Sequence, residues 1–269
     1  MYGFERFDDS LFWTLTSPEG ATSMVVGTVH VLDSSHISMP LSELEAELSR
    51  LRHLYVEIDP EEMKRLKSES EAGGLGVFAS AGGTPATPKQ LQRVAKIAES
   101  SPRLAPLSDQ LATLPTTILT HLIKVETQLR SELFETADLE LEDHFIAYAT
   151  EHDIPVSGLE EAADQFAHVN ADDDLDAALD AYDDPQSEDM FLNYAFQHPE
   201  LLSGAEMRSE AMVTRNAALA VALETKLRKN PGLVLIGAAH LPLDTGVLAV
   251  LENKEWDVGR VELTVENRR

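Results

Sequence analysis

Cysteine is absent from this 269-residue sequence, and its absence excludes several kinds of chemistry at once. A chain without thiols has no disulfide framework, no thiolate metal site and no cysteine nucleophile. Any metal ion would therefore be bound by histidine and carboxylate side chains. The sequence also has no His-Glu-x-x-His, no Gly-x-Ser-x-Gly and no phosphate-binding loop, which excludes the commonest zinc peptidase and serine hydrolase arrangements.

Basic residues are scarce. The chain has 21 Lys and Arg against 47 Asp and Glu, which gives a formal net charge of −26. Such a charge repels a polyphosphate backbone and an anionic membrane surface, so we expect no nucleic-acid partner. The acidic residues are spread along the whole chain, a pattern typical of halophilic proteins that stay solvated at high salt.

Long apolar runs are also missing. No segment reaches the roughly 18 apolar residues of a membrane span. The first residues, "MYGFERFDDSLFWTL", carry acids where a signal peptide would have a basic region. We therefore expect a soluble, cytoplasmic protein without a membrane span. A chain of this length can bury a substantial core as a single domain.

The N-terminal part predicts an α/β unit. "LFWTLTSPEGATSMVVGTVHVL" indicates a hairpin with a Ser-Pro-Glu-Gly turn. Leucines at 41, 44, 48, 51 and 54 follow the spacing of a helix over 41–54, and "LYVEID" at 54–59 indicates a short buried strand. Strand, helix and strand in this order are typical of a βαβ unit with parallel strands.

The rest of the chain predicts a helical middle and a second α/β unit. Helical patterns cover 88–99, 115–130, 137–151 and 204–230, an acidic stretch at 171–190 suggests a helix pair, and a short strand lies near 154–158. We therefore predict one α/β domain, 1–269. Its N-terminal lobe, 1–60, and its C-terminal lobe, 232–269, are both βαβ-type, form a mainly parallel sheet and flank a large helical insertion, 61–231.

Two Gly-x-x-His motifs end apolar strands, "VVGTVH" with Gly27 and His30, and "LIGAAH" with Gly237 and His240. Glycine allows a turn or a close approach of backbone or ligand just before each histidine. Glu57 and Glu160 end two further predicted strands. Because ligands gather at the carboxyl ends of the strands of an open α/β sheet, these four side chains form a reasonable ligand set for a divalent metal.

These segments carry a family resemblance. "VVGTVHVLDSSHISMP", "LYVEID", "DIPVSGLEEAADQ", "MVTRNAALA" and "LVLIGAAHLPLDTGVLAVLE" resemble, in this order, the signature segments of the TraB/GumN family, which includes the Tiki metalloproteases. The resemblance implies a fold related to erythromycin esterase and ChaN-like proteins. It also implies a metal-dependent hydrolase, in some members a peptidase, with manganese or cobalt rather than zinc as its ion.

The resemblance also assigns residues one by one. His30 and His240 match the motif histidines, Glu57 and Glu160 the acidic residues, and the pair Arg215 and Asn216 that of the long helix; Gln165 matches the glutamine that closes the third segment. Two positions depart from the family pattern. Glu161 replaces a more usual Thr, and Leu243 stands where Gly is commoner.

From these residues we expect His30, His240 and one or both glutamates to hold the ion. Glu57 is then the metal-proximal carboxylate, and Glu160 is the general base or orients a ligand. Arg215 would bind a substrate carboxylate or the developing oxyanion, or else pair with one of the glutamates. Gln165, Asn216 and His36, which follows His30 closely, are further candidates for contact with the substrate or the ligands.

Three interpretations remain open. The first is a metal-dependent hydrolase of peptides or of small amides or esters. The second is a non-catalytic binder of a peptide or a cofactor in the same fold. The third is a degenerate site whose helical insertion serves as an interaction surface. Helix pairs of this length commonly build dimer interfaces, so the sequence is compatible with a homodimer.

Overall fold

A computed structural model describes residues 7, 9–29, 32, 34, 37–71, 84–102, 104–129, 138–162, 174–183 and 208–267. The chain divides into two compact units. The first, which we call the sheet unit, comprises Met1–Pro60, Thr136–Glu160 and Asp189–Arg269. The second, the helical unit, comprises Glu61–Glu135 and Glu161–Glu188.

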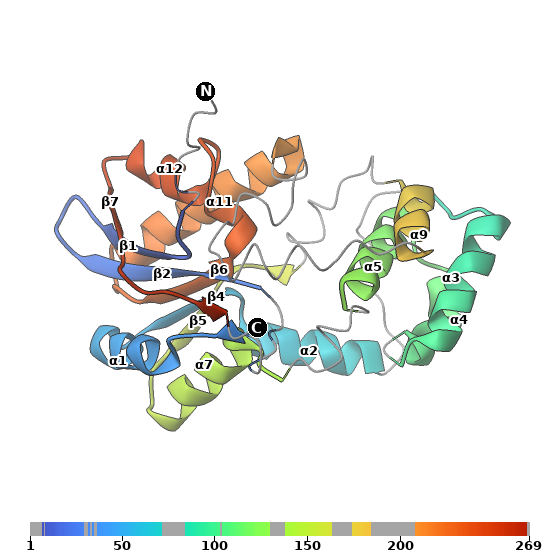
Figure 1. The fold of residues 1–269 in the computed structure, drawn as a ribbon, viewed down its shortest axis with the longest axis horizontal. Coiled ribbons are helices and arrows are strands. Elements are labelled where there is room, and N and C mark those ends of the chain that lie inside the picture. The colour runs from blue at the N-terminus through green and yellow to red at the C-terminus, as the bar shows by residue number, and fades with distance from the viewer. Residues whose placement is uncertain are drawn as a thin grey trace. The chain divides into compact units, whose positions relative to one another are not determined.

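The sheet unit is built on a six-stranded sheet with the order β5-β4-β6-β2-β1-β7 (Figure 1). The strands are β1 (Phe12–Thr16), β2 (Thr22–Thr28), β4 (Leu54–Ile58), β5 (Val156–Glu160), β6 (Leu233–Gly237) and β7 (Asp257–Arg260). β5, β4, β6 and β2 run parallel, whereas β1 is antiparallel to β2 and β7. The prediction of an α/β fold with a mainly parallel sheet is confirmed, and so is the N-terminal hairpin.

β6 lies between β2 and β4 and pairs in parallel with both. The two predicted βαβ-type lobes therefore share one continuous sheet, because a C-terminal strand separates two N-terminal ones. All residues of β6 except its last are buried, and its sequence LVLIG is accordingly apolar at every position. Such a continuous apolar run is expected of a central parallel strand with helices on both faces.

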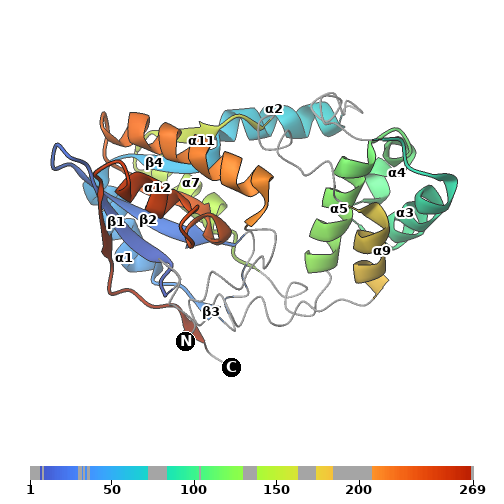
Figure 2. The same ribbon diagram turned by 90° about the horizontal axis from the view of Figure 1, so that it is seen from above.

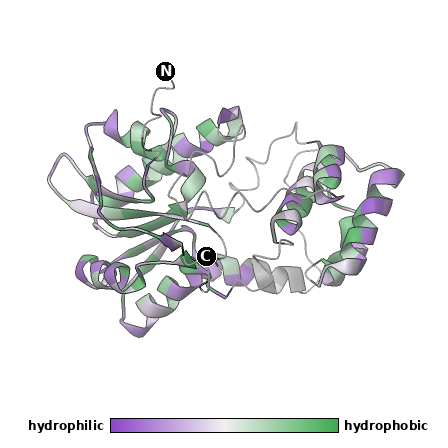
Figure 3. Ribbon diagram, viewed as in Figure 1, coloured by the Kyte–Doolittle hydropathy of each residue, from purple (hydrophilic) through white to green (hydrophobic). Residues whose placement is uncertain are grey.

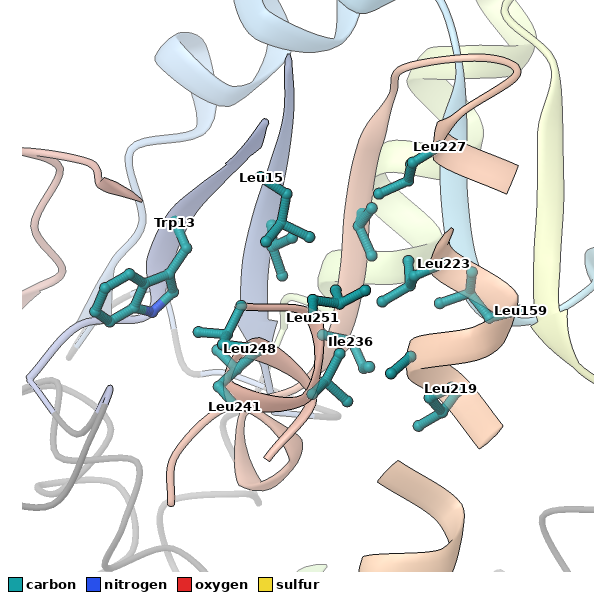
Figure 4. Packing of buried hydrophobic residues seen from close by; sticks show 14 of the residues in the cluster. Trp13, Leu15, Leu159, Leu219, Leu223, Leu227, Ile236, Leu241, Leu248 and Leu251 are labelled. Atoms are coloured by element: carbon teal, nitrogen blue, oxygen red, sulfur yellow. The ribbon is translucent and has the colours of Figure 1, made fainter. Parts of the chain in front are cut away.

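Helices cover both faces of this sheet. Figure 1 shows α11 (Glu210–Leu227) and α12 (Val247–Glu252) on one face and α1 (Leu41–Leu51) and α7 (Leu141–Glu151) on the other. Hydrophobic colouring concentrates on the central strands, and the hydrophilic residues lie along the outer helices (Figure 3). Beneath α11 and α12, buried side chains interdigitate with those of the sheet (Figure 4), among them Leu15, Ile236, Leu219, Leu223, Leu241, Leu248 and Leu251.

Several predicted elements end earlier than their sequence pattern. α1 stops at Leu51 because Arg52 adopts a left-handed conformation, φ 62°, and closes the helix with a backbone bond to Leu48. The sequence "DVGRVELTV", 257–265, favours one final strand, but β7 ends at Arg260. Residues further on form β8 (Glu266–Asn267), which pairs with β3 (Ile37–Ser38) in a separate two-stranded sheet. The sequence pattern does not indicate this pairing, since each strand has only two residues.

The helical unit contains α2 (Pro60–Glu71), α3 (Pro88–Ser100), η2 (Ala105–Leu107), α4 (Ser108–Leu111), α5 (Thr116–Leu129) and α9 (Leu175–Asp183). α5 and α9 pack side by side (Figure 2), around a core that includes Val94, Ile97, Ile118, Leu119 and Leu179. This unit is smaller than the predicted insertion 61–231, because α7, β5 and α11 pack on the sheet. Across the described residues, no helix is both long enough and apolar enough to cross a membrane.

Candidate functional site

The four parallel strands end at the same edge of the sheet. The described residues that were predicted to lie at strand ends meet at this edge. Ile58 in β4 pairs with Glu160 in β5, and Thr28 in β2 pairs with Gly237 in β6. Glu57 is therefore one position before the end of β4, and Glu160 is the last residue of β5. This is the edge at which open α/β sheets bind ligands.

Arg215, from α11, joins the two carboxylates. Its Nη2 donates to Glu57 Oε2 at 2.7 Å and also to Glu160 Oε1, and its Nε donates to Glu160 Oε1 at 3.1 Å and to Oε2 at 3.2 Å. The three side chains are only 14%, 16% and 9% exposed, in the order Arg215, Glu57 and Glu160. Burial by itself lowers the pKa of Arg215, but the charges of Glu57 and Glu160 outweigh burial and raise it. The guanidinium therefore stays charged and holds both carboxylates in place.

Glu57 also contacts the end of β6. Its Oε1 accepts a hydrogen bond from the backbone N–H of Gly237 at 2.6 Å. A Cβ at position 237 would lie 3.0 Å from Glu57 Oε1 and 3.4 Å from Cδ2 of the His240 ring. Glycine therefore allows a close approach of these two side chains that an alanine would permit only if they shifted, which agrees with the close approach expected from the Gly-x-x-His pattern.

His240 lies in a single 3-10 turn, η5 (Ala238–His240), that follows β6 directly. The side chain is 4% exposed, and its Nδ1 is 2.6 Å from Asn216 Oδ1, in a hydrogen bond. Burial lowers the pKa of His240 to about 4; Glu57 opposes this shift, and Arg215 adds to it. At neutral pH His240 is an uncharged imidazole, the form in which histidine binds metal ions.

Comparison with known proteins agrees with the resemblance seen in the sequence. The model of the TraB/PrgY/gumN family matches residues 11–260. The chain belongs to that family. Neither the curated proteins nor the solved structures yielded a match.

The TraB/PrgY/gumN match includes every described candidate residue, and the structure brings most of them together. Arg215, Glu57 and Glu160 form one set of hydrogen bonds, Asn216 and His240 form a second, and both sets reach Gly237 at the sheet edge. The remaining three candidates, His30, His36 and Gln165, lie outside the described residues. Of the two interpretations of Arg215, its described contacts are those of the ion pair, with both glutamates.

Gly27, the glycine of the first motif, serves close packing. A Cβ at this position would lie 2.8 Å from Leu241 Cδ1 and 3.2 Å from the Ala238 backbone. The end of β2 therefore presses directly against the turn that carries His240. Gly27 and Gly237 occupy equivalent motif positions but allow different approaches, the first of a core side chain and the second of the functional groups.

Sequence reasoning missed one polar contact near this edge. Thr28, the last residue of β2, donates from Oγ1 to Glu142 Oε1 at 2.7 Å. Glu142 lies in the first turn of α7, where a carboxylate is favoured by the helix dipole. The only available signal was the position of Thr28 between Gly27 and His30, and it does not point to a residue 114 positions away.

The metal ion implied by the family resemblance can be tested against the donor groups present. Within the described ranges, no three histidine or acidic side chains are placed together as metal ligands. A neutral, buried His240 and the Glu57 carboxylate nevertheless lie within 4.0 Å and 3.0 Å, respectively, of the same point above Gly237. A neutral imidazole and a carboxylate are donor types that bind divalent ions in proteins. His240 and Glu57 are therefore chemically compatible with such an ion.

Proposed function

We propose that this protein is a metal-dependent hydrolase that cleaves peptides or other amide or ester bonds at the carboxyl edge of its parallel strands. The observation that carries the proposal is a neutral, buried imidazole beside a carboxylate whose position is fixed by two hydrogen bonds. Membership of the TraB/PrgY/gumN family supports it. His240 and Glu57 would hold the ion, together with His30 of the first motif.

The ion, when bound, would supply a water of lowered pKa and a positive charge next to the scissile carbonyl. The chain's own residues supply position and charge. Arg215 fixes the Glu57 carboxylate through Oε2, and Gly237 fixes it through Oε1, so that the group loses little freedom when substrate arrives.

Glu160 acts through Arg215 in this proposal. Its oxygens accept three of the four hydrogen bonds that the guanidinium donates to the two carboxylates. Glu57 lies beside His240 at Gly237, which is why Glu57 is the carboxylate assigned to the ion. We expect Glu57→Gln to lower ion affinity and turnover together, and Glu160→Gln to have a smaller effect.

The first test is metal content. We expect protein purified without chelator, or offered Mn²⁺, Co²⁺ or Zn²⁺ after dialysis, to retain about one equivalent by elemental analysis. The His30→Ala/His240→Ala double variant should retain none. His152→Ala, at an exposed histidine that ends α7, is the matched control and should bind as the parent does.

Parent protein that retains no ion at neutral pH would refute the metal-dependent proposal. With an ion bound, a peptide-library hydrolysis screen separates a hydrolase from a non-catalytic binder. A hydrolase should lose turnover in Glu57→Gln while its affinity for substrate changes little. A binder would show no turnover in the parent and the same peptide affinity in both proteins.

A further inference from the structure

Asn216 lies between His240 and the loop that follows it. The side chain is 1% exposed and makes two hydrogen bonds. Its Oδ1 is 2.6 Å from His240 Nδ1, and its Nδ2 donates to the backbone carbonyl of Thr245 at 3.0 Å. Both ends of this buried amide are therefore engaged.

The two contacts together determine which atoms carry hydrogen. The Thr245 carbonyl oxygen can only accept, so the amide group that faces it must be the NH₂. The amide oxygen then faces His240, and it too can only accept. The His240 Nδ1 must therefore carry the proton, and in a neutral ring the lone pair is left on Nε2.

We infer that Asn216 is a positioning residue that fixes the Nδ1–H tautomer of His240, so that an Nε2 lone pair is presented on the side of Gly237 and Glu57. Nε2 lies 4.0 Å from the point that a Cβ would occupy at Gly237, and Glu57 Oε1 lies 3.0 Å from the same point. The inference deepens the proposed function and rests on it, since a lone pair at Nε2 is what a metal ligand requires.

The competing tautomer makes this role necessary. With the proton on Nε2, the ring would turn an N–H toward the neighbouring Glu57 carboxylate, which attracts positive charge. The Nε2 would then be a donor and could not bind an ion. The hydrogen bond to Asn216 favours the opposite tautomer, because Asn216 Oδ1 can accept from Nδ1 only when Nδ1 carries the proton.

The α11 helix serves the two halves of the site through consecutive residues. Neighbours on a helix point about 100° apart, so Arg215 reaches the glutamates while Asn216 faces His240. The carbonyl that accepts from Asn216 Nδ2 belongs to Thr245, in the loop Leu241–Gly246. In this loop Leu243 has a left-handed φ of 74°, and its carbonyl accepts from Gly246 N–H at 3.0 Å. That turn places the Thr245 carbonyl that orients the amide.

The test is the ¹⁵N NMR spectrum of the imidazole rings in metal-free protein, with the His240 signals assigned by comparison with His240→Asn. In the parent we expect the proton on Nδ1 and the lone pair on Nε2. In Asn216→Ala we expect this preference to be lost. Asn216→Asp keeps an acceptor oxygen for Nδ1–H and should keep the tautomer, although it loses the donor to Thr245.

This pair of variants separates positioning from a structural role. If Asn216 mattered only for satisfying the Thr245 carbonyl, Ala and Asp would be equally poor and neither would change the tautomer. Asn253→Ala, at the C-cap of α12, removes a similar amide without touching His240 and should leave the spectrum unchanged. A parent His240 with its proton on Nε2 overturns the inference, and so does an Asn216→Ala variant that keeps Nδ1–H. If neither variant folds, the parent tautomer alone decides.

A titration with Mn²⁺ or Zn²⁺ distinguishes this inference from the proposed function. We expect Asn216→Ala to weaken affinity about 10- to 100-fold, the usual effect of removing a group that orients a metal-binding histidine, and Asn216→Asp to weaken it less. If the tautomers follow the expected pattern but the parent binds neither ion, the positioning role stands and the metal-dependent hydrolase fails. If the parent binds an ion while its tautomer is Nε2–H in the metal-free state, the positioning role fails and the hydrolase stands.

Discussion

Arg215 in the sheet unit and Arg93 in the helical unit both join two carboxylates, but only one of them does so away from water. Arg93, on α3, donates to Asp180 at 2.8 Å and to Asp183 at 2.9 Å, both on α9. Its side chain is 28% exposed and those of its partners 74% and 72%, against 14%, 16% and 9% for the Arg215 set. Water and salt screen the first arrangement and hardly reach the second.

The difference shows how one contact type serves two purposes. An exposed ion pair contributes little to the free energy of unfolding, and Arg93 mainly adds specificity to the packing of α3 on α9. A buried set is costly to assemble but costlier to leave incomplete, because the remaining charges lose their counter-charge where water hardly reaches them. The Arg215 set therefore fixes two carboxylates at the sheet edge more than it stabilises the fold.

The largest expected effect comes from breaking the buried set. Arg215→Ala leaves Glu57 and Glu160 together without their cation, and we expect a loss of about 3–5 kcal/mol in the free energy of unfolding, measured by urea denaturation at pH 7. The triple variant with Glu57→Gln and Glu160→Gln should recover much of this loss. Equal stability of the single and triple variants would contradict an electrostatic cause.

The buried region should also respond to acid through His240. Its pKa is lowered from 6.5 to about 4, so the unfolded chain binds more protons than the folded one between these values. Stability therefore rises with pH in this window and falls as the pH drops from 6.5 toward 4. The loss across the window is about 3 kcal/mol, because a difference of one in pKa corresponds to about 1.4 kcal/mol.

The matched comparison uses His240→Asn, which keeps a donor toward Asn216 but does not titrate. In metal-free protein, the difference in unfolding free energy between parent and variant should shrink as pH falls from 7 to 4.5. A difference that stays constant across this range would mean that the His240 ring is not buried in the neutral form.

The next largest effect on stability should come from crowding at Gly237, at the edge of the sheet. Gly237→Ala would place a methyl group 3.0 Å from Glu57 Oε1, and we expect overpacking of about 1–3 kcal/mol with loss of metal binding. Gly20→Ala is the control, because Gly20 has a φ of 89° but open space around its Cβ position. It should lose some stability through the backbone and bind metal as the parent does. Equal metal affinity in Gly237→Ala would show that the crowding does not reach the ligands.

The smallest effect on the free energy of unfolding should come from the exposed arginine, Arg93. We expect Arg93→Ala to change the free energy of unfolding by about 1 kcal/mol or less, and less still at high salt. Denaturation at low and at molar salt measures both. A loss as large as that of Arg215→Ala would remove the distinction between the two arginines.

Local patterns sufficed to predict some of this structure. The leucine stripe identified α1, the apolar run identified β6, and Gly237 with His240 was correctly identified as the end of a strand with a close approach. The position of β6 between β2 and β4 could not be predicted, because strand order depends on pairings between residues far apart in sequence. For the same reason, the ion pairs of Arg215 with both Glu57 on β4 and Glu160 on β5 could not be predicted.

The hydrogen bond between Asn216 and His240 is a part of the site that could not be predicted from residue types and spacing. The Arg-Asn pair was noticed only through family resemblance, since neither residue type nor spacing marks an asparagine as the partner of a histidine 24 positions later. Leu243 was noticed as a departure from the family pattern. The structure shows the physical content of that departure: a leucine, 5% exposed, holds a left-handed conformation that glycine would adopt without strain.

The central place of β6 has a consequence for biosynthesis. Among the described strands, β1 pairs with β2 and β4 pairs with β5, but these two pairs meet only through β6. Its residues, Leu233–Gly237, are synthesised after all four of these strands. The inner edges of β2 and β4 therefore stay unpaired until β6 has been made, and the sheet closes through long-range contacts. Chains of this kind fold slowly and depend on protection of their open strand edges until the joining strand is available.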